Sequence, residues 1–459
     1  MYGSKLYGKE GQKMRQIRVI AVILCISMLL PLVFTSCKKD PETADELIQM
    51  TNEAMDAVGS YKQKIEMNLA VWVEDTQMSL DADGIGITID TEDDYYYYNE
   101  MNMEMTVGDS KTPEKSASLA VYDDGRVYFL EESNKKVNKY ASDATAEEYR
   151  AYLDENGEID DYIYDCGTKE FSKNEDGSWE IVLSDYTDKA LGGMYEKAGL
   201  ALLFDADSIK DIETEILVDE DFCVLEYELN FRFNEDEEGN KPQAVFKSEF
   251  SKHGEAERKD LDTEGYKNMN DLLEMKKLDR MLDEIITRES ATVQLNIRQS
   301  ITRHAYEIYN SAEYDKISYG IRDGKFFYDM TSNINGQNMQ IKYENGKQTI
   351  SASDQKTTTA SNDLIAKTTL AKILDCTGYE INSIKSFVNK GDEAYEVQLD
   401  KKNDESYKDV FGDGTELYDA TLDVTYTVKD GKITMINASG EIKEKGFCTL
   451  DISIFMSVE

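Results

Sequence analysis

Two similar phrases in this 459-residue chain limit how it can fold. FCVLEYELNF occupies residues 222–231, and FCTLDISIF occupies residues 447–455. In both phrases a leucine follows the cysteine by two positions, a carboxylate comes next, and apolar residues then recur at alternate positions. Alternation with a period of two is typical of a β-strand that buries one face. We therefore predict that the two phrases form equivalent late strands in the two halves of a duplicated chain.

The order of the expected elements repeats as well. Each half begins with an amphipathic helix, continues through alternating strands to a shorter helix, and ends in further strands. The first helix carries a capping-box pattern, because Thr43 is followed three residues later by Glu46, and Gly59 is expected to end it. A repeat period of roughly two hundred residues indicates tandem domains rather than a solenoid, and we place them at 43–265 and 266–459.

The first 36 residues resemble a targeting segment rather than part of the fold. Basic residues precede an apolar run at 19–34, and the sequence FTSC then ends at Cys37. This arrangement resembles the lipobox of bacterial lipoproteins, although phenylalanine stands at position 34 where leucine is usual. The resemblance implies that residues 1–36 are a signal peptide and that Cys37 carries a lipid such as palmitate. The alternative is an uncleaved anchor helix, since the run is about as long as a bilayer requires.

The targeting segment also bears on the start codon and on the length of chain between the lipid and the first domain. Translation begins at Met1 or at Met14, because MRQIR alone supplies a normal basic start to a signal peptide. Residues 37–42 form a short tether that reaches at most ~20 Å. Both kinds of anchor place the rest of the chain at the outer face of the cytoplasmic membrane, close to the lipid surface.

The charge balance excludes some classes of function. With 92 acidic and 51 basic residues, the formal net charge is −41. Nucleic-acid binding requires a surface of Lys and Arg, so we expect no such partner and interpret the excess charge as a solvated exterior. The two histidines, His253 and His304, have no nucleophile motif beside them. We therefore predict no catalytic residues, no metal site, no cofactor and no enzymatic activity.

Four cysteines follow the predicted lipidation site Cys37. Cys166 and Cys376 each come soon after the shorter helix of one half, and Cys223 and Cys448 each belong to one of the two similar phrases. We predict the disulfides Cys166–Cys223 and Cys376–Cys448, which an exported location permits. Sequence does not fix connectivity, and four buried thiols are the alternative. A zinc site is not expected, because there is no Cys-x-x-Cys pair and no histidine nearby.

Four consecutive tyrosines occupy positions 95–98. Such a run is able to form a surface on which sugars stack. A strand with both faces partly covered explains the run better, because aromatic residues favour half-buried pleated surfaces.

The element order resembles the LolA-like group of bacterial lipoproteins, which includes lipoprotein carriers and the LppX/LprG-type lipid-binding proteins. The likeness covers each predicted domain. It rests on the amphipathic first helix, the Ser-Tyr opening of the first strand at Ser60 and Tyr61, the long alternating meander and the short helices before the last strands. It implies an α+β fold in each domain, with a curved antiparallel sheet, or half-barrel, packed on the N-terminal helix and the short helices.

The resemblance also implies a function: a lipid-anchored extracytoplasmic protein that binds an apolar ligand such as a lipid or a lipopeptide. Methionine suits adaptable apolar pockets, and MNMEM places three methionines on one strand face. The candidate cavity residues are Met67, Leu69, Met101, Met103, Met105, Leu295 and Ile297. Ordinary core packing is the alternative interpretation of each residue. The alternative function is a non-catalytic structural or sensory envelope lipoprotein that acts through contacts with another protein.

Overall fold

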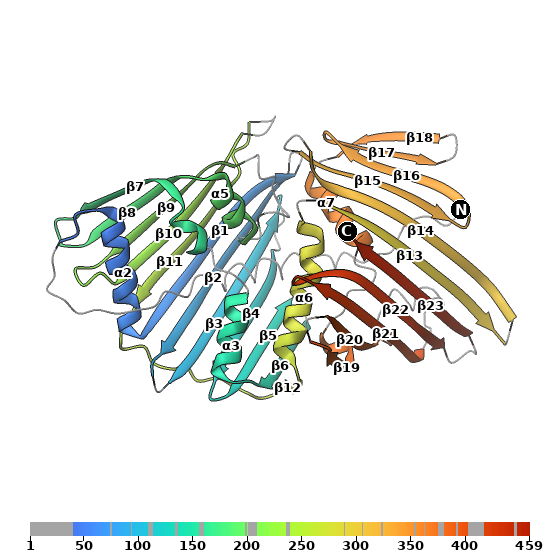
Figure 1. The fold of residues 1–459 in the computed structure, drawn as a ribbon, viewed down its shortest axis with the longest axis horizontal. Helices are drawn as coiled ribbons and strands as arrows, with labels where there is room; N and C mark the ends of the chain where they lie inside the picture. Colours follow the sequence, from blue (N-terminus) through green and yellow to red (C-terminus); the bar gives the residue numbers. More distant parts are fainter. Residues whose placement is uncertain are drawn as a thin grey trace. The chain divides into compact units, whose positions relative to one another are not determined.

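The computed structural model describes most of the chain from residue 40 onward. The described residues are 40–73, 76–92, 94–108, 113–133, 136–155, 160–197, 200, 209–235, 239–288, 290–304, 306–322, 325–352, 355–361, 363–374, 381–391, 393–402, 417–444 and 448–459. They form two compact units, of which the first ends at Leu272 and the second begins at Leu273. Each unit contains one large sheet (Figure 1).

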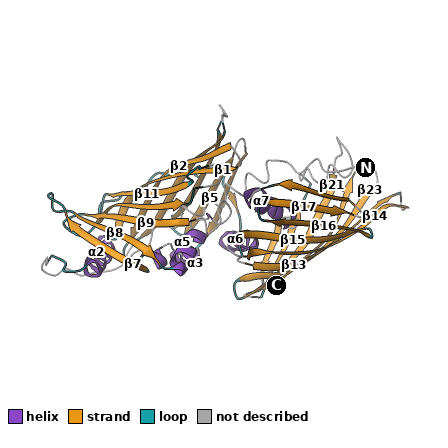
Figure 2. Ribbon diagram, turned by 90° about the horizontal axis from the view of Figure 1, so that it is seen from above, coloured by secondary structure: helices purple, strands orange, loops and turns teal. Residues whose placement is uncertain are grey.

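The first unit is a 12-stranded sheet with the order β12-β6-β5-β4-β3-β2-β1-β11-β10-β9-β8-β7. Its strands are β1 (Ser60–Val73), β2 (Thr76–Asp90), β3 (Tyr95–Val107), β4 (Glu114–Asp123), β5 (Arg126–Ser133), β6 (Lys136–Asp143), β7 (Cys166–Lys173), β8 (Trp179–Tyr186), β9 (Ile209–Val218), β10 (Val224–Phe233), β11 (Gln243–Ser251) and β12 (Lys267–Asn268). Its helices are α2 (Ala44–Val58), α3 (Ala146–Glu155), α4 (Asp160–Ile163) and α5 (Asp188–Lys197). Figure 2 shows α2, α3 and α5 on one side of this sheet, which we call its inner face.

The second unit is an 11-stranded sheet with the order β18-β17-β16-β15-β14-β13-β23-β22-β21-β20-β19. Its strands are β13 (Ser290–Arg303), β14 (Tyr306–Arg322), β15 (Lys325–Ile334), β16 (Gln337–Glu344), β17 (Lys347–Ala352), β18 (Gln355–Ala360), β19 (Ile384–Asn389), β20 (Ala394–Asp400), β21 (Leu417–Lys429), β22 (Lys432–Glu444) and β23 (Cys448–Val458). Its helices are α6 (Leu272–Thr287) and α7 (Asp363–Leu374), followed by a short 3-10 turn (Ile381–Ser383).

The two units share one topology. In each, a helix leads into a meander of six strands, a second helix follows, and five more strands return so that the last one pairs with the first. Thus β11 pairs with β1, and β23 pairs with β13, both antiparallel. The two-residue strand β12, which pairs in parallel with β6, is the addition that distinguishes the first sheet.

The predicted fold class is wrong. The described chain is mainly β, with 23 strands in the two sheets, so an α+β half-barrel packed on helices describes neither unit. Several strands are long, such as β14 with 17 residues, whereas α3 and α5 have 10 residues each. Periodicity identifies each helix and strand separately, but it does not show which of them forms the main layer. The prediction therefore gave the helices too large a share of the architecture.

The two phrases that suggested a duplication are not equivalent strands. The first forms most of β10, the strand that precedes β11, whereas the second forms most of β23, the last strand of the other unit. The strand equivalent to β23 is β11, since these are the two that pair with the first strands. Any strand with one buried face alternates with the same period, so similar letters arose at different positions of a repeated topology.

The start and end of the first helix agree with the sequence pattern. The hydroxyl Oγ1 of Thr43 accepts a hydrogen bond from the backbone N of Glu46 at 3.1 Å, and this closes the N-terminal turn of α2. The helix ends at Gly59, whose φ of 63° lies in the left-handed region that glycine adopts without strain.

Both faces of the tyrosine run are covered, as predicted. Tyr95 and Tyr97 lie on the inner face, where Tyr97 packs edge-on against Tyr149 of α3, with ring centroids 5.5 Å apart. Tyr96 and Tyr98 lie on the outer face in an apolar cluster with residues of β2 and β4. All four tyrosines are at most 8% exposed, which leaves no flat aromatic surface for stacking a sugar.

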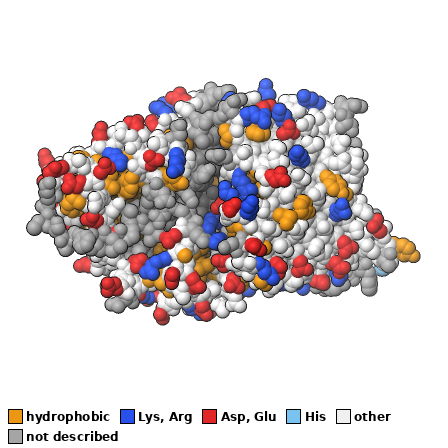
Figure 3. All heavy atoms as spheres, viewed as in Figure 1, with side chains coloured by type: hydrophobic (Ala, Val, Ile, Leu, Met, Phe, Trp, Pro, Cys, Tyr) orange, Lys and Arg blue, Asp and Glu red, His pale blue; other side chains and the backbone are white. Residues whose placement is uncertain are grey.

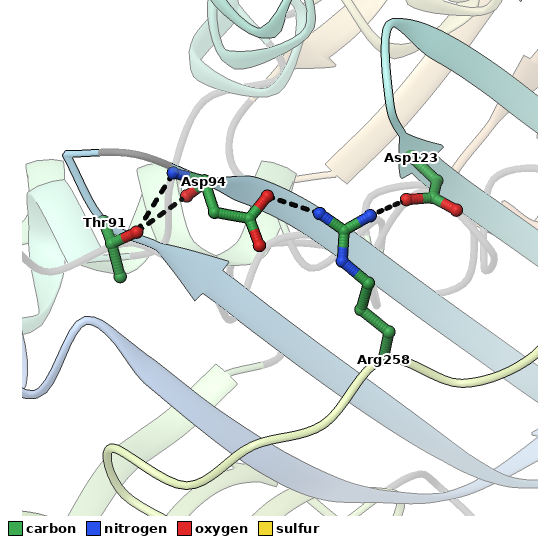
Figure 4. A network of polar contacts seen from close by, with 4 residues as sticks. All are labelled: Thr91, Asp94, Asp123 and Arg258. Carbon is green, nitrogen blue, oxygen red and sulfur yellow. Dashed lines mark hydrogen bonds and ion pairs between the residues drawn. The ribbon is translucent and has the colours of Figure 1, made fainter.

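A segment that we call the strap (residues 252–268) covers the outer face over the tyrosine run. Arg258 of the strap pairs with Asp94 and with Asp123, which lie at the ends of two neighbouring strands (Figure 4). The ammonium of Lys259 pairs with Glu100 at 2.5 Å and lies over the ring of Tyr98. The strap thus covers one end of the outer face. Its apolar side chains pack against the tyrosine cluster, and its basic side chains form ion pairs with carboxylates of the sheet.

The remaining exterior agrees with the interpretation of the charge as solvation. Over the face drawn in Figure 3, acidic and basic side chains are mingled. The ion pairs of the described residues are mostly between exposed side chains, such as Lys115 with Glu104 at 2.9 Å. Pairs of this kind contribute little to stability, typically about 0–1 kcal/mol each.

Candidate functional site

The predicted cavity residues of the first unit lie side by side on the inner face of its sheet. The paired positions of β1, β2 and β3 form three apolar rows: Ile65–Gly84–Met101, Met67–Ala82–Met103 and Leu69–Leu80–Met105. Met67, Leu69, Met101 and Met103 are between 1% and 6% exposed, and Met105 is half-buried. We call the four methionines and Leu69 the methionine patch. Strand register thus unites residues that the sequence separates by up to 38 positions.

Small residues on β2 form a trough in the middle of the patch. A Cβ at position 84 would collide with Sδ of Met101 and would lie 2.9 Å from its Cε, so the thioether end of Met101 lies across Gly84. Ala82 extends the trough between Met67 and Met103. Methionine has three rotatable side-chain bonds, so the side chain that fills this trough is able to rearrange.

The two cavity residues predicted in the second unit have a different environment. Leu295 is 2% exposed and pairs with Asp315, and Ile297 is half-buried and pairs with Glu313. Asp315 is itself only 5% exposed, on the same strand face as the buried Ile317. Burial, together with the charge of Asp315, raises the pKa of Glu313 to about 7, and burial also raises the pKa of Asp315. This face of the second unit therefore carries a carboxyl pair beside its apolar residues.

An open groove lies on the outer face of the first sheet, beyond the strap. Its volume is about 700 Å³, and its lining includes Glu66, Asp81, Asp83, Asn102, Glu104, Lys115 and Glu132. Like charges stand opposite each other here, since Glu66 pairs with Asp83 and Asp81 pairs with Glu104. This groove was not predicted from the sequence, although the carboxylates at alternate positions of β2 indicate an acidic strand face.

The predicted disulfide Cys166–Cys223 is wrong, because both cysteines are free thiols. Cys166 pairs with Tyr186 at one end of β8. Cys223 lies next to Val224, which is level with Trp179 at the other end of β8, because both residues pair with Val218 of β9. Trp179 and Tyr186 are seven residues apart along β8. Three strand spacings across the sheet and seven residues along a strand separate the cysteines by about 27 Å, whereas a disulfide needs Cα atoms about 5.5 Å apart. Similar sequence surroundings did not place the two thiols at the same end of the sheet.

The remaining cysteine predictions are only partly within the described residues. Cys448 is a half-buried free thiol at the start of β23. Its predicted partner Cys376 and the predicted lipidation site Cys37 lie outside the described residues, as does the whole targeting segment 1–36.

Thiol labelling tests the cysteine assignment. We expect Cys166 and Cys223 to react with a thiol reagent after unfolding, to the same extent with and without prior reduction. Replacing Cys166 with serine should lower the thiol count by one, because no partner is released. A disulfide would give the opposite result, namely an additional free thiol in each single variant and labelling only after reduction.

Three potential metal ligands meet at one end of the first sheet. The ligand atoms of Asp219, Cys223 and His253 all lie within 4.8 Å of one another. Asp219 and Cys223 belong to the turn between β9 and β10, and His253 follows β11 by two residues. In the sequence no histidine lies near a cysteine. The antiparallel pairing of β10 with β11 returns the chain over 30 residues and brings His253 beside Cys223.

Hydrogen bonds fix the turn that carries two of these ligands. Oδ1 of Asp219 accepts from the backbone N of Asp221 at 2.8 Å and from that of Cys223 at 2.9 Å. Phe222 adopts a left-handed φ of 69°, and its backbone N donates to the carbonyl of Asp219. Burial, followed by the charges of Asp219 and Asp221, raises the pKa of Cys223 to about 11. The thiol thus lies in a partly desolvated environment of negative potential.

Comparisons with known proteins identify no relative. No protein-family model matches the chain, and no curated protein matches it. Among solved structures, a candidate AttH protein of Nitrosomonas europaea has a TM-score of 0.13 and 7% identity, over 94% of this chain and 99% of that one. A porin-like protein of Bacteroides uniformis has a TM-score of 0.11 and 9% identity, over 86% and 97%. A DNA polymerase sliding clamp of Pseudomonas aeruginosa has a TM-score of 0.12 and 8% identity, over 96% of both chains.

TM-scores this low do not carry an argument about fold or function. None of these three structures is a LolA-like protein, so the LolA-like resemblance of the sequence stays a prediction. Among the described residues, no helix combines the length and the apolar character needed to cross a bilayer.

Proposed function

We propose that this protein is a lipid-anchored extracytoplasmic binding protein that takes up an apolar ligand, such as a lipid acyl chain or a lipopeptide, at the methionine patch of its first unit. The observation that carries the proposal is the arrangement of Met67, Met101 and Met103 around the small residues Ala82 and Gly84. The sequence resemblance to a lipobox at Cys37 supports the anchored location.

The physical argument concerns how a buried trough opens. Gly84 and Ala82 leave space above β2, and this space is filled by the flexible end of Met101 rather than by a rigid branched or aromatic side chain. An acyl chain that displaces the Met101 side chain replaces its apolar contacts with β2 by similar apolar contacts. The free-energy cost of opening the trough is therefore mainly that of changing the conformation of Met101. Each methylene group that an acyl chain buries contributes about 0.8 kcal/mol, so several methylenes outweigh the movement of one side chain.

The two units are not equivalent for this role. The corresponding face of the second unit carries Asp315 and Glu313 opposite its predicted cavity residues. Burying hydrocarbon against a carboxyl pair leaves polar groups without water, which is costly. We therefore assign the apolar ligand to the first unit alone.

Lipid retention tests the proposal. Protein produced without residues 1–36 is expected to carry lipid detectable by native mass spectrometry and by organic extraction. Replacing Met103 with glutamine should lower the retained lipid and the affinity for a fluorescent fatty acid by about tenfold or more, because a polar amide would be desolvated by the chain.

The matched control replaces Met330 with glutamine. Met330 is 4% exposed on β15 of the second unit and lies outside the patch. This variant should retain as much lipid as the unaltered chain. Absence of lipid and of fatty-acid binding in the unaltered chain would contradict the proposal and favour the alternative of a structural or sensory protein that contacts another protein.

A further inference from the structure

The strongest cluster outside the methionine patch is the group formed by Asp219, Cys223 and His253. It combines one carboxylate, one thiol and one imidazole. The first two belong to the turn between β9 and β10, and the imidazole follows β11. We propose that these three side chains bind a divalent transition-metal ion of the zinc class. This proposal does not depend on the proposed apolar ligand.

The geometry requires only a small contraction. In a tetrahedral zinc site with a Zn–S bond of roughly 2.3 Å and a Zn–N bond of roughly 2.0 Å, neighbouring ligand atoms lie about 3.5 Å apart. The three ligand atoms here all lie within 4.8 Å of one another. The ligand atoms must therefore approach one another by at most about 1.3 Å for a zinc ion to bind all three.

Asp219 is already held in an orientation that suits a metal ligand. Its Oδ1 accepts the two backbone hydrogen bonds of its own turn, from Asp221 and Cys223. Within the described residues Oδ2 makes no hydrogen bond, so it is the oxygen that a cation would receive. The same two bonds fix the Cα of Cys223 relative to the carboxylate. Ligands held by such supporting contacts lose less entropy on binding.

His253 supplies an independent indication of a ligand. Its Nε2 atom is buried and has no hydrogen-bond partner among the described residues. The turn that carries it is fixed, since the backbone N of Gly254 donates to the carbonyl of Ser60 at 2.8 Å and that of Glu255 donates to Lys252 at 2.9 Å. A buried ring nitrogen without a partner is unfavourable, and a metal–nitrogen bond at this atom would satisfy it.

The donor set defines the class of ion. Calcium and magnesium prefer oxygen ligands alone, whereas a thiolate and an imidazole together favour zinc and neighbouring late transition metals. Binding replaces the S–H bond of Cys223 with a metal–sulfur bond, and the displaced proton passes to the solvent. Three protein ligands leave one of the four tetrahedral positions for water or for a further group.

The environment around the cluster suits a cation. Asp221 adds a second carboxylate to the turn that carries Asp219 and Cys223, two residues before the thiol. Next to Cys223, the backbone N of Val224 donates a hydrogen bond to Sδ of Met55 of α2 at 3.3 Å, and Met55 is 5% exposed. The cluster therefore combines nearby negative charge with a buried apolar contact at Met55, and lower solvent exposure strengthens the attraction of a carboxylate for a cation.

Metal titration of the reduced, full-length chain tests the proposal. We expect Zn²⁺ to bind with a stoichiometry that falls by one when Cys223 is replaced with serine. Co²⁺ should give the visible bands of tetrahedral coordination together with a thiolate charge-transfer band. Replacing Cys223 with serine, or His253 with glutamine, should weaken binding by more than about tenfold, since even outer ligand partners change metal affinity 10–100-fold.

Matched variants separate this site from other thiols and imidazoles. Cys166→Ser and His304→Gln alter the same residue types elsewhere and should leave the affinity and the Co²⁺ spectrum unchanged. Asp219→Asn keeps an oxygen that can accept the two turn hydrogen bonds, so it tests the carboxylate charge in a chain that still folds. Absence of a thiolate–Co²⁺ band, or equal affinity in the Cys223→Ser and Cys166→Ser chains, would overturn the proposal.

Discussion

Replacing Gly440 with valine is expected to destabilise the second unit by roughly 4 kcal/mol. Gly440 lies in β22, where it pairs with Leu422 of β21 and Ile452 of β23. A Cβ at this position would collide with the carbonyl oxygen of Thr421 and would lie 3.0 Å from Cα of Leu422. Both obstacles are backbone atoms, so no change of side-chain rotamer relieves them and the hydrogen-bonded ladder itself must shift.

The measurement is urea-induced unfolding followed by circular dichroism. Gly192→Ala is the matched control, because a Cβ at this position of α5 would meet nothing within 4 Å. That variant should be neutral or slightly stabilising, since alanine is the better helix former by about 1 kcal/mol. If Gly440→Val unfolds at the same urea concentration as the unaltered chain, then the close approach of β21 and β22 is not a requirement of the fold.

The stability of the second unit is expected to fall as the pH rises from 5 to 8. In the folded state the pKa of Glu313 is raised from 4.5 to about 7, chiefly by burial and then by the charge of Asp315. A carboxyl whose folded pKa is raised contributes stability that is fully present below its unfolded pKa and is lost as the pH rises through the folded value. The loss therefore falls in the window between about pH 4.5 and pH 7. The full shift corresponds to about 3 kcal/mol, and solvent screening of this half-exposed carboxyl lowers the expected loss to about 2 kcal/mol.

Substitutions identify the group responsible for this pH dependence. Glu313→Gln should remove most of the dependence and should raise the stability of the second unit at pH 8, because the amide stays neutral. Glu307→Gln changes an exposed glutamate on the same strand and should leave the dependence unchanged. An equal slope of unfolding free energy against pH in the unaltered and Glu313→Gln chains would assign the titration to other groups.

Local signals in the sequence were sufficient for local structure. The capping residue Thr43 and the terminating Gly59 bound α2 as expected, since both act through bonds and dihedral angles within one turn. The burial of the tyrosine run on both faces was also predicted, because alternating positions of a strand point to opposite faces. The methionines of β3 were placed on one face for the same reason.

Inferences that depended on distant parts of the chain were less reliable. The similar phrases at 222–231 and 447–455 suggested a duplication, and the two units do share a topology, but the phrases occupy different strands of it. The two cysteines assigned to one disulfide lie at opposite ends of the sheet. Similarity of sequence surroundings records strand periodicity, which many strands share, and not the position of a strand within a sheet.

The sequence by itself determined which residues alternate, where the first helix begins and ends, and which side chains share a strand face. These features depend on dihedral angles and on neighbours within about four residues. Only the tertiary structure decided that Met67 meets Met103 across Ala82, that Glu313 and Asp315 stand opposite the apolar pair of the second unit, and that His253 returns to Cys223. Register and chain reversal fix these pairings through backbone hydrogen bonds between distant strands, so no local pattern contains them.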